Sequence, residues 1–407
     1  MASGPVRVKM AGDKNKPTGD AMSIDDAINY DDLRLLAKKR LPQIAFDFIE
    51  GGADDEIGLD RNQRAFRDIA LVPRYLRNID GINQKTELFG RTYDRPFGIS
   101  PTGLIGLFRP GGDLMLASAA REANIPFVMS GSANCTVEEL GQTAPDHGWF
   151  QLYAARDNKI SEDMIRRAEA VGLSTLVLTV DVPVHSNRER NVRNGFSRPL
   201  KMSLETRLDA MSHPGWLAGY LKNGMPVISN WLPYAKNGAN ADDVAGLVTE
   251  QVTAPLTWDS VARFRDLWPR NLVLKGIMHV EDAIKAAEVG VDGIVVSNHG
   301  ARQLDRAPAS LEVLPGIVAA VGDRMTVMLD SGIQRGSDIV TALCLGAKFV
   351  FTGRFTLYGV TAGAKPGAVK ALDIIGQEVD MIMAQMGAPD IASLGDEFIY
   401  KPQPRNY

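Results

Sequence analysis

Short apolar stretches alternate with longer amphipathic stretches along most of the chain after residue 96. Each short stretch is rich in β-branched residues and ends in a small or polar residue, whereas the longer stretches have the three-to-four-residue periodicity of helices. Eight short stretches follow this pattern: 97–100, 127–130, 149–153, 175–181, 272–276, 293–297, 326–331 and 348–353. Because apolar strands that alternate with helices form a parallel sheet covered on both faces, we predict a closed (β/α)8 TIM barrel.

An open, doubly wound sheet is the alternative arrangement of such units. No GxGxxG pattern follows a first strand, which disfavours a dinucleotide-binding sheet. Before the barrel, the pattern predicts one helix over 23–42, begun by Ser23 and ended at Pro42, and a second over 43–50. The polar, Lys- and Gly-rich residues 1–22 predict a mobile tail, and we interpret 23–407 as a single domain.

Composition and charge exclude several classes of function. The 45 Lys and Arg residues against 49 Asp and Glu give a net charge of −4, which provides no basic field for nucleic acid. Two cysteines and five scattered histidines form no metal-ligand pattern, so we expect neither a disulfide framework nor a metal site. No segment approaches the ~18 to 20 apolar residues of a membrane-spanning helix. We expect a cytoplasmic protein whose membrane contact, if any, is peripheral, on the inner face.

The connection between the fourth and fifth predicted strands is several times longer than a usual connection. It predicts an insertion at about 190–245, which includes the aromatic, Pro- and Gly-containing segment MSHPGWLAGYLKNGMPVISNWLPYAKNGAN. A lid over the barrel mouth is the simpler interpretation. The alternative is a flap whose aromatic and lysine side chains also rest on a membrane surface.

Polar side chains stand where the predicted strands end, and barrel enzymes have their active sites at that face. These residues are Ser100, Ser130, Gln151, Tyr153, Thr179, Asp181, Lys275, His299 and Asp330. Asp181 and His299 would share one mouth, where a carboxylate raises the basicity of an imidazole. Arg188 and Arg302 could hold a carboxylate through forked hydrogen bonds. Each residue alone could be an ordinary loop group, but their co-location favours an active site.

The last two predicted strands are followed by features of a phosphate site. The segment LDSGIQRGSDI begins a helix after a Gly-rich turn, and FTGRF places Gly353 and Arg354 at the next strand end. Backbone N–H groups and an arginine at these two positions bind phosphate in many barrels. We therefore predict a phosphate-bearing cofactor. Lys275 would be either a Schiff-base former or a positive charge beside an electron-accepting ring.

The motifs QLY, LTVDVP followed by RER, LVLKG, SNHGARQLD, LDSG with RGSDI, and TGR together resemble the FMN-dependent L-2-hydroxy acid oxidases and dehydrogenases. The resemblance extends from about residue 30 to about residue 394. The segments SPTGLIG, SGSANCT and PDIASL and the long insertion are most similar to the (S)-mandelate dehydrogenases. The resemblance implies FMN, oxidation of an aryl-substituted, mandelate-like L-2-hydroxy acid to the 2-keto acid, and electron transfer to a quinone or carrier, or to oxygen in an oxidase. Barrels of this kind often form homotetramers.

The resemblance also implies a role for each residue of the mouth. His299 would be the catalytic base and Asp181 its partner, while Tyr153, Arg188 and Arg302 would hold the substrate. The residues around the flavin ring would be Pro101, Thr102, Gly103, Ser130, Gln151, Thr179 and Lys275. Those around the ribityl phosphate would be Asp330, Gly332, Gly353 and Arg354.

Two residues of this chain depart from the family pattern. Phe48 stands where a tyrosine normally donates a hydrogen bond to the substrate carboxylate, a bond worth roughly 1.5 to 3 kcal/mol. Weaker binding or a different substrate, such as an ester or a peptide-derived hydroxy group, would follow. Gln334 replaces a phosphate-binding arginine while Arg335 and Arg354 remain, so FMN would be kept but held less tightly.

Two small residues suggest the substrate and the electron acceptor. Ser132 stands where glycolate-oxidising members have a tryptophan, which predicts a mouth wide enough for an aryl or long side chain. Gly103 stands where oxidases commonly have alanine, which favours an acceptor other than oxygen. A non-catalytic flavoprotein is the alternative from another class, and the joint presence of the base and both arginines disfavours it.

Overall fold

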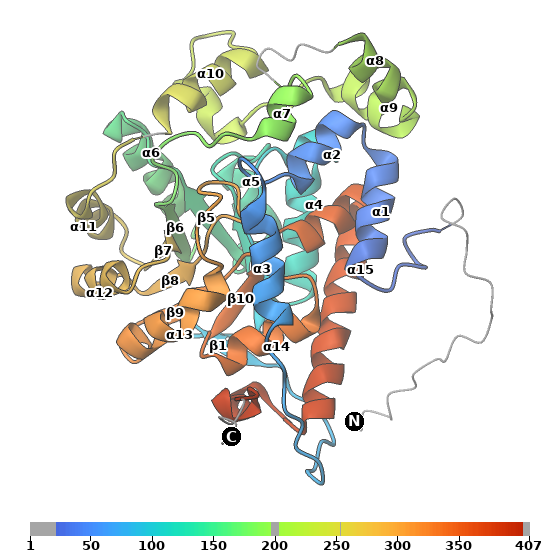
Figure 1. Cartoon of the computed structure of the whole chain (residues 1–407). Helices are drawn as coiled ribbons and strands as arrows, with labels where there is room; N and C mark the ends of the chain where they lie inside the picture. The colour runs from blue at the N-terminus through green and yellow to red at the C-terminus, as the bar shows by residue number, and fades with distance from the viewer. Residues whose placement is uncertain (1–21, 197–202, 253, 402–407) are drawn as a thin grey trace.

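The computed structural model describes residues 22–196, 203–252 and 254–401. The tail predicted over 1–22 lies outside these ranges apart from Met22. Eight parallel strands close into a barrel in the order β10-β3-β4-β5-β6-β7-β8-β9, surrounded by helices (Figure 1). Their bounds are β3 Phe97–Ile99, β4 Phe127–Met129, β5 Gly148–Leu152, β6 Thr175–Thr179, β7 Asn271–Ile277, β8 Gly293–Val296, β9 Thr326–Leu329 and β10 Phe349–Thr352.

All eight predicted strands are present, and the predicted (β/α)8 TIM barrel is confirmed. Every residue of β5, β6, β8 and β10 is buried, because helices cover the outside of the barrel and side chains fill its inside. The surrounding helices are α4 Gly112–Glu122, α5 Val137–Thr143, α6 Asn158–Ala170, α11 Trp258–Leu267, α12 Val280–Val289, α13 Ser310–Val321, α14 Gly336–Cys344 and α15 Arg354–Met386. Short 3-10 helices are η1 Ile105–Leu107, η3 Ile391–Ser393 and η4 Asp396–Phe398.

Three helices precede the barrel: α1 Tyr30–Arg40, α2 Gln43–Glu50 and α3 Ile57–Arg67. The second predicted helix is confirmed by α2, but the helix predicted from Ser23 begins later. The Ser23 hydroxyl donates to the Asp26 carboxylate in a local turn, and the side chain of Asn29 caps α1 instead. A short polar side chain can satisfy a turn as well as a helix start, which explains the wrong boundary.

The amino end of the barrel is closed by a hairpin that the pattern did not predict. Its strands are β1 Thr86–Leu88 and β2 Arg91–Tyr93. Leu88 and Tyr93 pack into the same buried cluster as Trp149, Phe349 and Phe351 from the barrel interior. Space for a ligand is therefore left at the opposite end, where the strands finish.

The insertion lies across the carboxyl ends of the strands, at the top of Figure 1. It forms α7 Glu189–Arg193, α8 Leu204–Met211, α9 Pro214–Asn223, η2 Ser229–Tyr234 and α10 Ala241–Gln251. Trp216 and Trp231 are buried, and their indole N–H groups donate to the carbonyls of Leu107 and Gly131. These bonds attach the insertion to the loops that follow β3 and β4, so it covers the mouth as an integral part of the core.

Candidate active site

A cavity of about 720 Å³ lies at the carboxyl ends of the strands. Sixteen of the eighteen predicted site residues line it: Phe48, Pro101, Thr102, Gly103, Ser130, Tyr153, Thr179, Arg188, Lys275, His299, Arg302, Asp330, Gly332, Gln334, Gly353 and Arg354. The other two lie directly behind the lining. Gln151 accepts a hydrogen bond from Ser130, and Asp181 contacts His299.

His299 and Asp181 form a close pair. Nδ1 of His299 lies 3.0 Å from Oδ1 and 3.2 Å from Oδ2 of Asp181. Burial lowers the pKa of His299, although Asp181 partly offsets this effect. Burial alone would raise the pKa of Asp181, but the positive charges of His299 and Lys275 keep that pKa below its usual value. Near neutral pH the carboxylate therefore accepts from Nδ1, which leaves Nε2 of a neutral imidazole free to take a proton.

The loop after β8 holds His299 in an unusual backbone conformation. His299, Gly300 and Ala301 have φ values of 59°, 63° and 60°, in the left-handed region that only glycine adopts without strain. The Ser297 hydroxyl accepts from the His299 amide at 3.0 Å, which supports this turn. Gly276 has a φ of 105°, and a Cβ there would lie 2.5 Å from Asp181. Glycine at 276 therefore lets Asp181 reach the imidazole.

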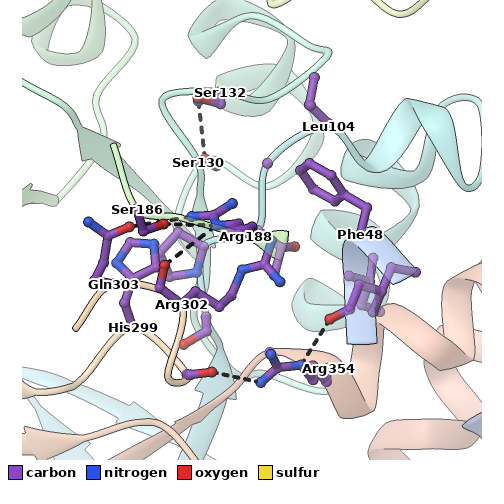
Figure 2. Close-up of a pocket in the computed structure, with 18 of the residues that line it drawn as sticks. Phe48, Leu104, Ser130, Ser132, Ser186, Arg188, His299, Arg302, Gln303 and Arg354 are labelled. Carbon is purple, nitrogen blue, oxygen red and sulfur yellow. Dashed lines mark hydrogen bonds between the residues drawn. The ribbon is translucent and has the colours of Figure 1, made fainter. Parts of the chain in front are cut away.

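Arg188 and Arg302 lie side by side near His299 (Figure 2). Arg302 donates to the carbonyl of Gly51 at 2.6 Å, and Arg188 contacts Ser186 and Gln303. Across the described ranges, neither arginine has a carboxylate within ion-pair distance. Burial, together with the charges of Arg188 and Arg354, lowers the pKa of Arg302 well below its usual value. A bound anion would relieve this cost, so the pair is suited to a carboxylate.

Arg354, at the start of α15, donates to the same Gly51 carbonyl as Arg302 (Figure 2). Its guanidinium donates to the carbonyls of Ile49, Gly51 and Gly300. Arg335 is turned away from the cavity: its side chain is 50% exposed and forms an ion pair of 2.9 Å with Glu378. Although Arg335 remains in the sequence, it therefore does not line the cavity, because a carboxylate from α15 holds it outside.

The polar atoms at the strand ends fit a flavin. Among the described residues, Thr102 Oγ1, Gln151 Nε2 and Thr179 Oγ1 are buried without a hydrogen-bond partner. Buried polar groups without partners are costly, so these atoms call for a polar ligand. Lys275 lies 3.1 Å from Asp330. Burial alone would lower the pKa of Lys275, but Asp330 and Asp181 raise it, so the lysine stays charged beside the same space.

Phe48 extends from α2 into the cavity. The Arg302 guanidinium carbon lies 5.3 Å from the centre of its ring, and the ring of Phe196 lies 4.8 Å away. Phe48 therefore presents an aromatic face to the arginine but no hydrogen-bonding group. Phe196 was missing from the prediction, because nothing in its local sequence shows that it folds back onto the mouth.

Comparison with protein families gives a match to FMN-dependent dehydrogenases over residues 37–401. The chain belongs to this family. It is 40% identical over 371 residues to (S)-mandelate dehydrogenase of Pseudomonas putida, covering 91% of this chain and 93% of that protein. It is 37% identical to an L-lactate dehydrogenase of Caulobacter vibrioides, covering 92% and 98% of the two chains.

Solved structures of the FMN-dependent dehydrogenase family agree with this assignment. A crystal structure of the monotopic membrane protein (S)-mandelate dehydrogenase has a TM-score of 0.90 and 39% identity, covering 93% of this chain and all of that one. A mandelate oxidase structure has a TM-score of 0.76 and 33% identity, covering 90% and 97%. The protein is therefore an FMN-dependent oxidoreductase of the 2-hydroxy acid dehydrogenases and oxidases, and the predicted cofactor is confirmed.

Proposed function

We propose that this protein oxidises an L-2-hydroxy acid with an apolar, aryl-type side chain to the 2-keto acid and passes the electrons to a quinone or carrier. One observation carries the proposal: the His299–Asp181 pair shares a cavity with two half-buried arginines, Arg188 and Arg302, which have no carboxylate partner among the described residues. A substrate with a hydroxyl and a carboxylate on adjacent carbons needs a base beside an anion-binding pair.

Each residue of the site then has its own role toward the substrate. Nε2 of His299 takes a proton, either from the α-carbon or from the hydroxyl in concert with hydride transfer, and Asp181 stabilises the imidazolium that forms. Arg188 and Arg302 bind the carboxylate. Burial and the charge of Asp181 raise the pKa of Tyr153, so it remains a phenol that donates a hydrogen bond to the substrate.

Bound FMN supplies the acceptor for the two electrons that the substrate loses. Thr102, Gln151 and Thr179 would hold its polar edge with their unpartnered atoms, and Lys275 would place a positive charge beside it. Pro101, Gly103 and Ser130 would complete the ring site. The ribityl phosphate would lie against Asp330, Gly332, Gln334, Gly353 and Arg354.

The substrate is tested first by anaerobic stopped-flow absorbance of the flavin after mixing with L-mandelate, L-lactate, glycolate or the methyl ester of mandelate. We expect the fastest bleaching with L-mandelate, because Ser132 and Gly103 keep the mouth open and the relatives include (S)-mandelate dehydrogenase. Bleaching by the ester alone, or by none of the four, would contradict the proposal and direct attention to Phe48.

The acceptor is tested by reoxidation of the reduced enzyme with oxygen and with a soluble quinone. A Cβ on Gly103 would lie only 3.0 Å from the Cβ of Ser132, so the glycine leaves space that an alanine would fill. We expect the quinone to reoxidise the enzyme faster. Faster reoxidation by oxygen, with hydrogen peroxide released, would make the protein an oxidase instead.

We also propose that α8 and α9 contact the inner surface of a membrane peripherally. Leu204, Leu208, Met211 and Leu221 are exposed on these helices, and a solved relative is a monotopic membrane protein. Within the described ranges, no helix is long and apolar enough to cross a bilayer. Scattered exposed leucines are common, so the grouping on two adjacent helices carries the proposal.

Co-flotation with anionic phospholipid vesicles tests the membrane proposal. We expect Leu208→Ser combined with Leu221→Ser to lower the bound fraction, and Leu267→Ser on α11 to leave it unchanged. Equal binding of all variants would contradict the proposal. Point substitutions are preferable to removal of 205–238, since that deletion would also remove the buried Trp216 and Trp231.

We further propose that residues 23–407 form one domain and that the protein assembles as a homotetramer. The hydrogen bonds that attach the insertion to the barrel support the first point. Tyr75 and Leu76, both exposed on a loop before the β1–β2 hairpin, are available for subunit contacts. Sedimentation equilibrium gives the subunit number directly, and a monomer would contradict the second point.

A further inference from the structure

Helix α10 gives the cavity a wall to which no role has been assigned so far. Ala245, Val248 and Thr249 of this helix, and Val252 directly after it, all line the cavity. Their spacing of three and four residues places them on one helical face. Ile228 also lines the cavity and extends this wall with another aliphatic side chain. We call these five residues the α10 wall.

The α10 wall is apolar inside and open at its outer end. Ala245, Val248 and Ile228 are only 2%, 7% and 4% exposed. Thr249 is exposed to solvent although it lines the same cavity, and His185 beside it is also exposed. The wall therefore runs from the buried centre of the cavity to its opening and offers no charged side chain along the way.

Hydrogen bonds hold α10 to the barrel. Nε2 of His185, in the loop after β6, lies 3.1 Å from the carbonyl of Thr249. The amide of Arg156, in the loop after β5, donates to the carbonyl of Gln251 at 3.0 Å. The wall is thus fixed to the same loops that carry Asp181 and Tyr153, so it is part of the active-site frame.

The charged residues of the cavity account for two parts of the substrate, its carboxylate and its reacting carbon. The carboxylate belongs with Arg188 and Arg302, and the reacting carbon belongs beside His299. The side chain of the acid is the one part left, and the α10 wall offers it apolar surface without a competing charge. A short side chain such as a methyl group would leave most of that surface uncovered.

We propose that the α10 wall is a side-chain pocket that selects L-2-hydroxy acids whose apolar side chains are longer than a phenyl group attached directly to the α-carbon. This inference rests on the proposed function and names its substrate class. Linear aliphatic chains and arylmethyl groups both fit this description. The apolar ring of a quinone-type acceptor is the other candidate for the same surface.

A series of substrates with side chains of increasing length tests the size of the pocket. The FMN-loaded enzyme is mixed anaerobically with L-lactate and with the L-2-hydroxy acids of four, six and eight carbons, then with L-mandelate and L-3-phenyllactate. We expect the second-order rate of flavin bleaching to rise roughly fourfold for each added methylene until the wall is covered. We also expect L-3-phenyllactate to exceed L-mandelate. A rate that is flat or falls with length overturns the inference.

Variants of α10 test whether the dependence on side-chain length arises at the α10 wall. Val248→Phe fills the wall, so we expect it to lower the rate ratio of the eight-carbon acid to L-lactate at least tenfold, and Val248→Ala should raise that ratio. Gly246→Phe is the matched control, because Gly246 is exposed, does not line the cavity, and a Cβ there would meet no atom within 4 Å. Flavin content and melting temperature show whether each variant is folded. If Val248→Phe loses FMN, Val252→Phe is used in its place.

The outcomes separate the competing explanations. A ratio that does not respond to Val248→Phe overturns the inference. Slower reoxidation by a soluble quinone in Val248→Phe, with an unchanged substrate ratio, also overturns it and assigns the wall to the acceptor. Bleaching by short acids without any length dependence overturns this inference alone, whereas bleaching by no 2-hydroxy acid overturns the proposed function and this inference together.

Discussion

Each end of the barrel holds a histidine, half-buried at the carboxyl end and buried at the amino end, and the two differ in their partners. At the carboxyl end, His299 contacts the carboxylate of Asp181 at 3.0 Å. At the amino end, Nη2 of Arg91 lies 3.0 Å from Nε2 of His147, just before β5. Burial lowers the pKa of His147 to about 4, and the positive charge of Arg91 adds to this effect.

Burial lowers the pKa of both histidines, and the neighbouring charge decides whether this effect is offset or reinforced. An imidazole beside a carboxylate can keep a proton that it has taken, whereas one beside a guanidinium cannot. Space differs as well, because the β1–β2 hairpin packs its Leu88 and Tyr93 side chains into the amino end. The chemistry is therefore expected at one end only, and the following changes test that difference.

Replacing each histidine by glutamine should give the largest difference in the rate of flavin bleaching between the two ends of the barrel. In His299→Gln we expect the bound flavin spectrum to be kept and bleaching by substrate to slow by about 10² to 10⁴, the usual contribution of a general base. His147→Gln should keep the rate within a few-fold. Stopped-flow absorbance compares them, and full bleaching in His299→Gln or an equal loss in both variants would contradict the assignment.

Arg302→Met removes one member of the anion-binding pair while keeping much of its bulk. We expect the dissociation constant of the substrate, measured by the concentration dependence of bleaching, to rise about 10- to 100-fold through the loss of charged hydrogen bonds. Arg335→Met is the matched control, because Arg335 is paired with Glu378 outside the cavity. A similar loss in both variants would argue against a carboxylate clamp.

Phe48→Tyr should strengthen carboxylate binding. The ring already lies against Arg302, so a hydroxyl on it would stand beside the anion site. We expect about tenfold tighter binding of the hydroxy acid, the equivalent of one hydrogen bond to a charged group. Phe89→Tyr in the hairpin at the amino end should change nothing in the same titration. Weaker binding in Phe48→Tyr would show that this chain uses the bare ring for its own substrate.

Gln334→Arg should strengthen the binding of FMN. Gln334 lines the cavity near the predicted phosphate position, where Arg354 already donates to three backbone carbonyls. A second cation there should lower the FMN dissociation constant about two- to fivefold, as for a partly exposed ion pair. Fluorescence of released FMN measures this constant. Weaker binding would place the phosphate away from residue 334.

His147 should affect only the acid stability of the fold. Its pKa falls from 6.5 in an ordinary setting to about 4 in the fold, so protonation favours the unfolded chain. The stability contribution of neutral His147 is present above pH 6.5 and is lost as the pH falls towards 4. Melting temperatures between pH 7 and pH 4.5 should fall less in His147→Gln. An identical slope would show that other groups govern acid unfolding.

The barrel and most of its mouth could be predicted from local sequence. A strand with both faces covered is apolar throughout, so all eight strands were visible as apolar runs with polar ends. The β1–β2 hairpin has only three residues per strand and gives no such signal. The start of α1 was misplaced because serine and asparagine both favour a helix start, but the Ser23 hydroxyl donates to Asp26 in a turn, whereas the Asn29 side chain accepts from the Asp32 amide and begins the helix.

The sequence by itself determined which residues stand at the ends of the strands, because strand periodicity and barrel closure bring those ends together wherever the loops go. Only the tertiary structure decided which way the loop residues face. Arg335 points outward because Glu378, more than forty residues later, holds it, and Arg354 points inward to the carbonyls at the end of α2. The α10 wall likewise depends on how that helix is rotated over the mouth, and long-range contacts set this rotation.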